Sequence, residues 1–172
     1  MMRIYTILSR LLDYPTAELV ENFSAIMDTI KTDPDISEDE RKGMMDLIAW
    51  MQVHDVIGLQ QNYVNTFDMT PEHDLHLTHH LFGDDRGRGP ALIDLNEHYK
   101  ANGLAVDSKE IPDFLPLILE YVSTLDEMQA RVFLGDAGKV VTVIAENLEK
   151  VESPYARVLR IIENRGRLAQ AA

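Results

Sequence analysis

The chain has 172 residues, a formal net charge of −13 and 45% hydrophobic residues, and it contains no cysteine. At roughly 150 residues per domain, this length predicts one domain, residues 1–172, with a substantial hydrophobic core. The missing cysteines exclude disulfide frameworks, thiolate zinc sites and cysteine nucleophiles, and the excess of carboxylates argues against a nucleic-acid-binding protein.

Helical periodicity dominates the first half of the chain. Apolar residues spaced three and four positions apart predict a helix over residues 19–30, which ends near Pro34. Ser37 and Glu40 have the spacing of a capping box, so a second helix is expected to begin there. Another apolar stripe predicts a helix over residues 56–67.

The second half continues this pattern. Residues 102–103, Asn-Gly, are typical of a helix C-terminus, and Asp113 is expected to cap the next helix. Thr124 and Glu127 have the spacing of a further capping box. The β-branched residues of segment 139–144 favour a strand, but the apolar residues around them repeat at helical intervals, so a helix is predicted. These elements together predict an all-α, single-domain helical bundle.

The two ends of the chain differ in character. Arginines interrupt the apolar residues of segment 1–12, and no apolar run approaches the roughly 18–20 residues that span a bilayer. A cytoplasmic protein without membrane insertion is therefore expected. Residues 154–172 hold four arginines and one glutamate, which predicts a basic terminal helix on an acidic body.

Segment 72–90 is the least core-like part of the chain. On a helix His73, His76 and His80 would share one face, a pattern that suits a metal ion, although surface or packing histidines explain it better. The glycines and arginines of residues 83–89 lack the pattern of a nucleotide-binding loop and fit either a turn or a positively charged hinge.

Aromatic and methionine side chains lie in and around this irregular middle. They are Tyr63, Phe67, Met69, Phe82 and Phe114. Each is expected in a core when considered alone. Together with the acidic composition, they are also consistent with a groove for an apolar peptide.

Three central blocks of sequence resemble the delta subunit family of respiratory nitrate reductases. The longest, residues 76–95, reads HLTHHLFGDDRGRGPALIDL. It is preceded by Tyr63-x-x-x-Phe67-Asp68 and followed by residues 110–121, EIPDFLPLILEY. The amino-terminal Leu8-x-x-Leu11-Leu12-x-Tyr14-Pro15 is also similar, so the resemblance extends over most of the chain.

This resemblance implies a chaperone rather than an enzyme, with a helical fold of the TorD/NarJ-like type. Such a protein binds the amino-terminal segment of a molybdoenzyme catalytic subunit, here the nitrate reductase alpha subunit or that of a related molybdoenzyme, before the complex docks on its membrane partner. It holds that subunit while molybdenum bis-molybdopterin guanine dinucleotide is inserted, and cofactor biosynthesis proteins are further partners. No cofactor is expected to stay bound, and the oligomeric state is left between a monomer and a domain-swapped dimer.

The resemblance also places a peptide-binding surface in the central blocks. Its expected members are Tyr63, Phe67, Asp68, His76, Leu77, His80, Phe82, Gly83, Asp84 and Asp113. The three aspartates of this set are expected to form an acidic rim. A hinge, near residues 83–90, is expected at Arg86, Gly87, Arg88 and Gly89, with its arginines contacting the client or the phosphates of its cofactor.

Two other functions remain open at this point. One is a small helical metal-binding protein that uses His73, His76 and His80. The other is a structural adaptor that binds the finished enzyme.

Overall fold

The computed structural model of the protein describes residues 3–82, 87–104 and 110–171, and the regular structure of this part is helical. The helices are α1 (Arg3–Leu12), α2 (Ala17–Glu21), α3 (Phe23–Thr32), α4 (Glu38–Gln52), α5 (Val56–Tyr63), the π-helix η1 (Val64–Asp68), the 3-10 helix η2 (Pro71–His73), α6 (Leu77–Phe82), α7 (Arg88–Ala101), α8 (Leu115–Val122), α9 (Glu127–Asp136), α10 (Gly138–Lys150) and α11 (Ala156–Ala171). The all-α prediction is confirmed.

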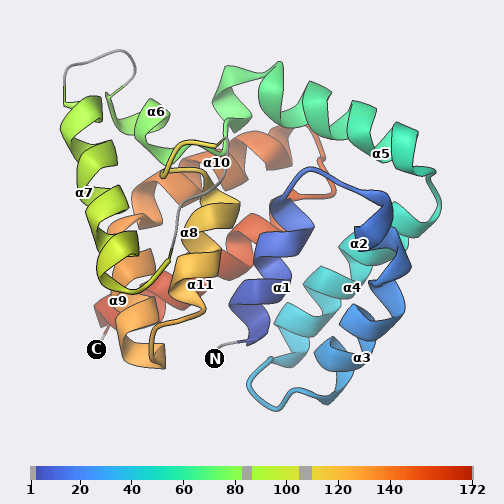
Figure 1. Cartoon of the computed structure of the whole chain (residues 1–172). Helices are drawn as coiled ribbons and strands as arrows, with labels where there is room; N and C mark the ends of the chain where they lie inside the picture. Colours follow the sequence, from blue (N-terminus) through green and yellow to red (C-terminus); the bar gives the residue numbers. More distant parts are fainter. Residues whose placement is uncertain (1–2, 83–86, 105–109, 172) are drawn as a thin grey trace.

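Helix α11 is the centre of the packing. It contacts α9, α10 and α4, while α1 packs against α8 although the two are far apart in the sequence (Figure 1). Gly166 allows α11 to approach α9 closely, because a Cβ at this position would lie 2.8 Å from the carbonyl carbon of Leu134. The last helix of the chain therefore organises helices from both halves.

The helix predicted over residues 19–30 is interrupted at Asn22. This residue ends α2 and precedes α3, and its side-chain Nδ2 donates to the carbonyl oxygen of Glu18 at 2.8 Å. Asparagine competes in this way with the backbone hydrogen bonds of a helix. The apolar stripe is preserved across the break, since Leu19, Phe23 and Ile26 are all buried.

One predicted capping box is confirmed and the other is wrong. At the start of α4, Ser37 and Glu40 bond to each other's backbone amides as expected. The helix α9 is capped instead by Asp126 and Gln129. Thr124 donates its hydroxyl to the carbonyl oxygen of Tyr121 at 2.6 Å and so belongs to the end of α8.

The β-branched segment 139–144 lies within α10, as the helical spacing predicts. Gly103 has a φ of 77°, a left-handed conformation that glycine adopts without steric cost, and it follows the end of α7 as expected. Both predictions, the helix over residues 139–144 and the end of α7 near Gly103, depend on residues that are close together in the sequence.

The arginines of α11 are not free on the surface. Arg157 pairs with Asp46, Arg165 with Glu40, and both Arg160 and Arg167 with Glu163. The predicted basic helix is present, but its arginines are paired with acidic residues of α4 and with Glu163 of α11 itself.

Candidate functional site

Two of the three sequence blocks meet at the entry to α6. His76 forms an isolated antiparallel bridge with Phe114, and their rings stack with centroids 5.0 Å apart. The amide of Leu77 donates to the carbonyl oxygen of Asp113, and the amide of Leu115 donates to that of Leu75. These backbone bonds fix segment 75–78 beside the start of α8.

Asp113 is a buried anchor of this junction. Its side chain is completely inaccessible, and its Oδ2 accepts hydrogen bonds from the amide and the hydroxyl of Thr78, at 2.9 and 2.5 Å. Arg88 approaches the same oxygen at 3.8 Å and donates its Nε to the Thr78 hydroxyl at 2.9 Å. The expectation of Asp113 on an acidic rim is therefore wrong, as is its expected role as a cap of α8, which Phe114 precedes without a side-chain cap.

His76 lies between two carboxylates. Its Nδ1 contacts Asp74 at 2.7 Å and its Nε2 contacts Glu110 at 2.9 Å. Burial favours the neutral imidazole, but the hydrogen bonds to both carboxylates outweigh it and raise the pKa of His76 to about 9. The ring is therefore cationic at neutral pH and joins the η2–α6 segment to the segment before α8.

Further carboxylates surround this pair. Burial and then the charges of Glu110 and Asp74 raise the pKa of exposed Asp68, and burial together with Glu110 raises the pKa of Asp13. We call Asp13, Asp68, Asp74 and Glu110 the acidic cluster. The effect of Glu110 on the pKa values of both Asp68 and Asp13 shows that negative charge is concentrated here, with His76 as its internal cation.

Two of the expected groove residues lie in the core instead. Tyr63 and Phe67 are each only 3% exposed, and their rings pack with Tyr155 of the segment before α11. The Tyr63 hydroxyl donates to the carbonyl oxygen of Leu12 at 2.7 Å. Their spacing of four residues is the same for a core stripe and for a groove, and here the core accounts for both.

An apolar groove is lined instead by α6 and the helices that follow it. It has a volume of about 340 Å³ and lies between α6, α7, α8 and the α9–α10 corner. Its apolar lining includes Leu77, Leu81, Leu95, Ile118, Phe133 and Val140. Asp94 and Asp136 also line it, and Leu81 is 61% exposed. We call this the α6–α10 groove, and of the expected peptide-binding residues it contains Leu77.

The histidines do not converge on one point. His73 is buried between the carbonyl oxygens of Thr66 and Asn147, whereas the His80 ring contacts the carbonyl oxygen of Asp74. Within residues 3–82, 87–104 and 110–171, no group of three or more His, Cys, Asp or Glu is arranged to hold a metal ion. The metal-binding alternative has no support in this geometry.

The hinge residues fall only partly within the described chain. Gly83, Asp84 and Arg86 and the side chain of Phe82 lie outside it. Gly87 precedes α7 with a φ of −65°, and a Cβ at Gly89 would meet nothing within 4 Å. Arg88 is engaged with Thr78 and Asp113, so at this position the arginine serves an internal junction rather than a free contact.

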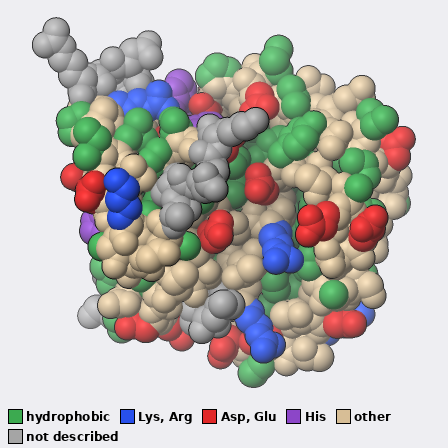
Figure 2. Space-filling model, viewed as in Figure 1, with side chains coloured by type: hydrophobic (Ala, Val, Ile, Leu, Met, Phe, Trp, Pro, Cys, Tyr) green, Lys and Arg blue, Asp and Glu red, His purple; other side chains and the backbone are tan. Residues whose placement is uncertain are grey.

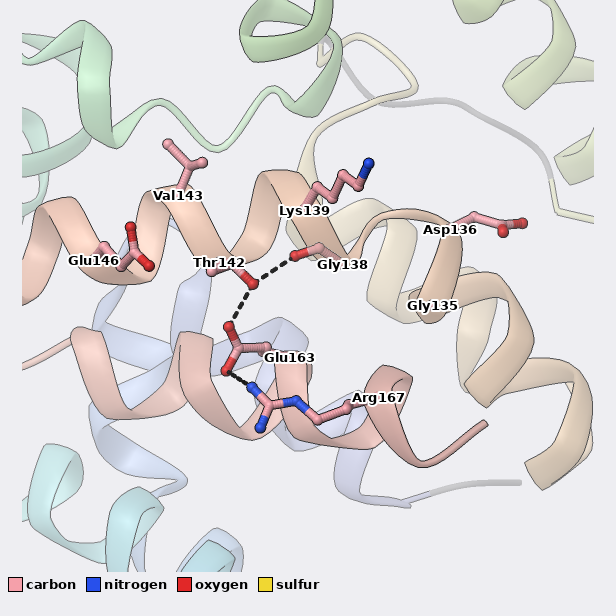
Figure 3. A pocket seen from close by; sticks show the side chains of 9 residues that line it. All are labelled: Gly135, Asp136, Gly138, Lys139, Thr142, Val143, Glu146, Glu163 and Arg167. Carbon is pink, nitrogen blue, oxygen red and sulfur yellow. Dashed lines mark hydrogen bonds and ion pairs between the residues drawn. The ribbon is translucent and has the colours of Figure 1, made fainter. Parts of the chain in front are cut away.

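A second, polar cleft of about 690 Å³ lies between α10 and α11 (Figure 3). The Glu163 carboxylate, 5% exposed, accepts hydrogen bonds from Thr142, Arg160 and Arg167. Figure 3 shows the side chains of Lys139 and Asp136 directed away from this carboxylate. Because Glu163 is already neutralised, the cleft is best explained as the polar joint between α10 and α11.

The described chain contains no helix that is both long and apolar enough to cross a membrane.

A sequence model of the family described as nitrate reductase delta subunit matches residues 33–160.

Curated relatives agree with this match. The chain is 31% identical over 150 residues to the nitrate reductase molybdenum cofactor assembly chaperone NarJ of Escherichia coli (strain K12), a match that covers 87% of this chain and 64% of that protein. It is 28% identical over 154 residues to the probable chaperone of the same description, NarW, of that strain, covering 90% and 64%. The match to the probable chaperone NarJ of Bacillus subtilis (strain 168) is 33% over 105 residues, covering 61% and 57%. The chain thus spans less than two thirds of the length of these relatives.

Proposed function

Because the chain belongs to the nitrate reductase delta subunit family, we propose that it is a cytoplasmic assembly chaperone for a nitrate reductase. In this proposal it is not an enzyme and retains no cofactor. It binds the amino-terminal segment of the catalytic subunit while the molybdenum bis-molybdopterin guanine dinucleotide cofactor is inserted, before the complex reaches its membrane partner.

The α6–α10 groove is the observation that carries the proposal. An amphipathic helix docks by burying its apolar face in an apolar groove, and this groove offers leucine, isoleucine, phenylalanine and valine side chains with two carboxylates beside them. A basic amphipathic segment would complement both features. Leu77 joins the groove to His76 and the acidic cluster, whose negative charge would speed the encounter with a basic peptide.

The test is calorimetric titration with the amino-terminal peptide of the nitrate reductase catalytic subunit from the same organism. We expect saturable binding that weakens with salt. Leu81→Glu should weaken it by at least about tenfold, because a carboxylate would then have to be buried in an apolar contact. Ile57→Glu is the matched control, since Ile57 is similarly exposed, at 66%, but lies on α5 away from the groove lining.

The carboxylates require a separate pair of variants. Asp94→Lys should weaken binding and reduce its salt dependence, whereas Asp39→Lys, in the exposed first turn of α4, should leave both nearly unchanged. Equal binding by Leu81→Glu and the unaltered chain would exclude the groove as the site. Absence of peptide binding by the unaltered chain would contradict the proposed client segment. Equally tight binding of mature enzyme would favour the adaptor function.

A further inference from the structure

Two arginines of α1 differ from the other arginines that the structure describes. Arg3 and Arg10 are exposed and form no ion pair with any described residue. The remaining described arginines each pair with a carboxylate, and they are Arg41, Arg88, Arg131, Arg157, Arg160, Arg165 and Arg167. In a chain with a net charge of −13, these two unpaired arginines on one short helix form a local concentration of positive charge.

These arginines border a groove between α1 and α3, which we call the α1–α3 groove. It has a volume of about 240 Å³. Its lining consists of Arg3, Thr6, Ile7, Arg10, Asn22, Ala25, Ile26 and Thr29 and includes no carboxylate. Basic side chains lie over α1 in Figure 2, on a face that also carries many acidic side chains. The groove is thus a local positive site on an acidic surface.

The two helices present their groove residues in matching rows. On α1 the arginines are seven residues apart, which places them on one face and about 10.5 Å apart along the helix axis. On the other side, Asn22 immediately before α3 and Ala25 and Thr29 within it occupy positions i, i+3 and i+7, with Ile26 below them. Ile7 and Ile26 are each only 6% exposed and form the apolar floor of the groove. Ala25 is exposed at its edge, and its side chain is small.

We propose that the α1–α3 groove binds an amphipathic helix of another protein, one that carries two carboxylates seven residues apart beside an apolar face. The spacing would bring one carboxylate to Arg3 and the other to Arg10, and the apolar face would cover the floor between them. This partner has the opposite charge to the basic segment expected in the α6–α10 groove. The chain would therefore hold two partners at once, on separate surfaces.

The neighbouring hollow restricts how such a helix lies. It shares Arg10, Asn22 and Ile26 with the groove but is also lined by Asp13 and Glu18. A carboxylate placed beyond Arg10 would meet these two acidic residues. The acidic positions of the partner must therefore lie over the stretch from Arg3 to Arg10.

The experiment uses a synthetic helical peptide of about 15 residues, long enough to form a helix on contact, with an alanine and leucine face and two glutamates seven residues apart. A control peptide has lysines in place of the glutamates. Binding is followed by fluorescence anisotropy of the labelled peptide at low and high salt. We expect saturable, salt-sensitive binding of the glutamate peptide alone.

Two pairs of variants locate the binding. Arg3→Glu combined with Arg10→Glu should weaken binding at least about tenfold, because two attractions become repulsions. Lys31→Glu combined with Lys42→Glu makes the same change in net charge outside the groove and should alter binding less than about twofold. Ala25→Glu should weaken binding, whereas Ser24→Glu, its exposed neighbour on α3, should not.

Circular dichroism verifies that every variant retains its helical structure. Failure of the glutamate peptide to saturate, or equal binding of the lysine peptide, would overturn the proposal. Equal loss in the two double variants would also overturn it, since the effect would then be one of net charge. If the unaltered chain forms a dimer that the Arg3→Glu and Arg10→Glu changes dissociate, the occupant is a second copy and the proposal is wrong. Because the basic client peptide should bind the Arg3→Glu and Arg10→Glu variant normally, the test is independent of the proposed function.

Discussion

Asp113 and Thr78 are 35 residues apart in the sequence and share two hydrogen bonds in the interior, one to the Thr78 amide and one to its hydroxyl. This contact ties the start of α6 to the segment that precedes α8. Arg88 at the start of α7 joins it through the Thr78 hydroxyl. One buried carboxylate thus holds together three segments that border the α6–α10 groove.

Asp113→Ala is expected to destabilise the fold rather than to weaken peptide binding directly. The substitution leaves the Thr78 amide and hydroxyl buried without an acceptor and removes the carboxylate that faces Arg88, so we expect a loss of about 2–4 kcal/mol in the free energy of unfolding. Urea denaturation measures it. Asp28→Ala, at an exposed position of α3, should change stability by less than about 0.5 kcal/mol. Similar stabilities of these two variants would contradict the anchoring role of Asp113.

The pH dependence of stability should report on His76. Its pKa is about 9 in the folded chain and roughly 6.5 when unfolded, so its ion pairs stabilise the fold fully below about pH 6.5. The contribution is lost as the pH rises through 9, when the folded imidazole also loses its proton. Because Glu110 is half-exposed, we expect a contribution of about 1–2 kcal/mol rather than the full value of the shift.

His76→Gln should therefore flatten the decline in the free energy of unfolding between about pH 6.5 and 9. His54→Gln is the matched control, since His54 is exposed and its ring contacts the carbonyl oxygen of Trp50 rather than a carboxylate. Denaturation midpoints measured across this pH range distinguish the two variants. A decline that persists in His76→Gln would assign it to another group.

Short-range patterns predicted the helices well, while burial of the site residues required the tertiary structure. The Ser37–Glu40 box and the helical spacing of segment 139–144 depend on neighbours within one or two turns, and both predictions are confirmed. The bond between Asp113 and Thr78 has no such local signal. Sequence motifs singled out the segments that hold Thr78 and Asp113, but they did not distinguish a rim carboxylate from a buried one.

The same limit applies to the aromatic pair of the first central block. Tyr63 and Phe67 share one helical face in either a core or a groove, and only Tyr155 across the interface decides between them. The α6–α10 groove, in contrast, is assembled from five separate helices, and its members have no common spacing in the sequence. Leu77 was predicted from the sequence because it lies in one of the central blocks. The other apolar residues that line the groove were not predicted as binding residues.

Phe67→Ala should accordingly act as a core substitution. Removing a ring that is 3% exposed leaves a cavity beside Tyr63 and Tyr155, and we expect a loss of about 3–5 kcal/mol in the free energy of unfolding. Met69→Ala, two residues later and 70% exposed, should cost less than about 0.5 kcal/mol. Thermal melts followed by circular dichroism suffice. If Phe67→Ala melts like the unaltered chain, its ring is not part of the core.

Gly166→Ala should separate α9 from α11. The added Cβ would lie 2.8 Å from both the carbonyl carbon and oxygen of Leu134, which are backbone atoms that cannot rotate away. The helices must move apart to accept it, so we expect a loss of about 2–3 kcal/mol in the free energy of unfolding despite the better helix propensity of alanine.

Gly138→Ala provides the matched control for this substitution. Gly138 is also helical, as the first residue of α10, but a Cβ there meets nothing within 4 Å, so only the propensity term remains and we expect a gain of up to about 1 kcal/mol. Urea denaturation of the two variants gives opposite signs if close helix packing decides the first and propensity the second. A stabilising Gly166→Ala would show that α9 and α11 are not in backbone contact at this position.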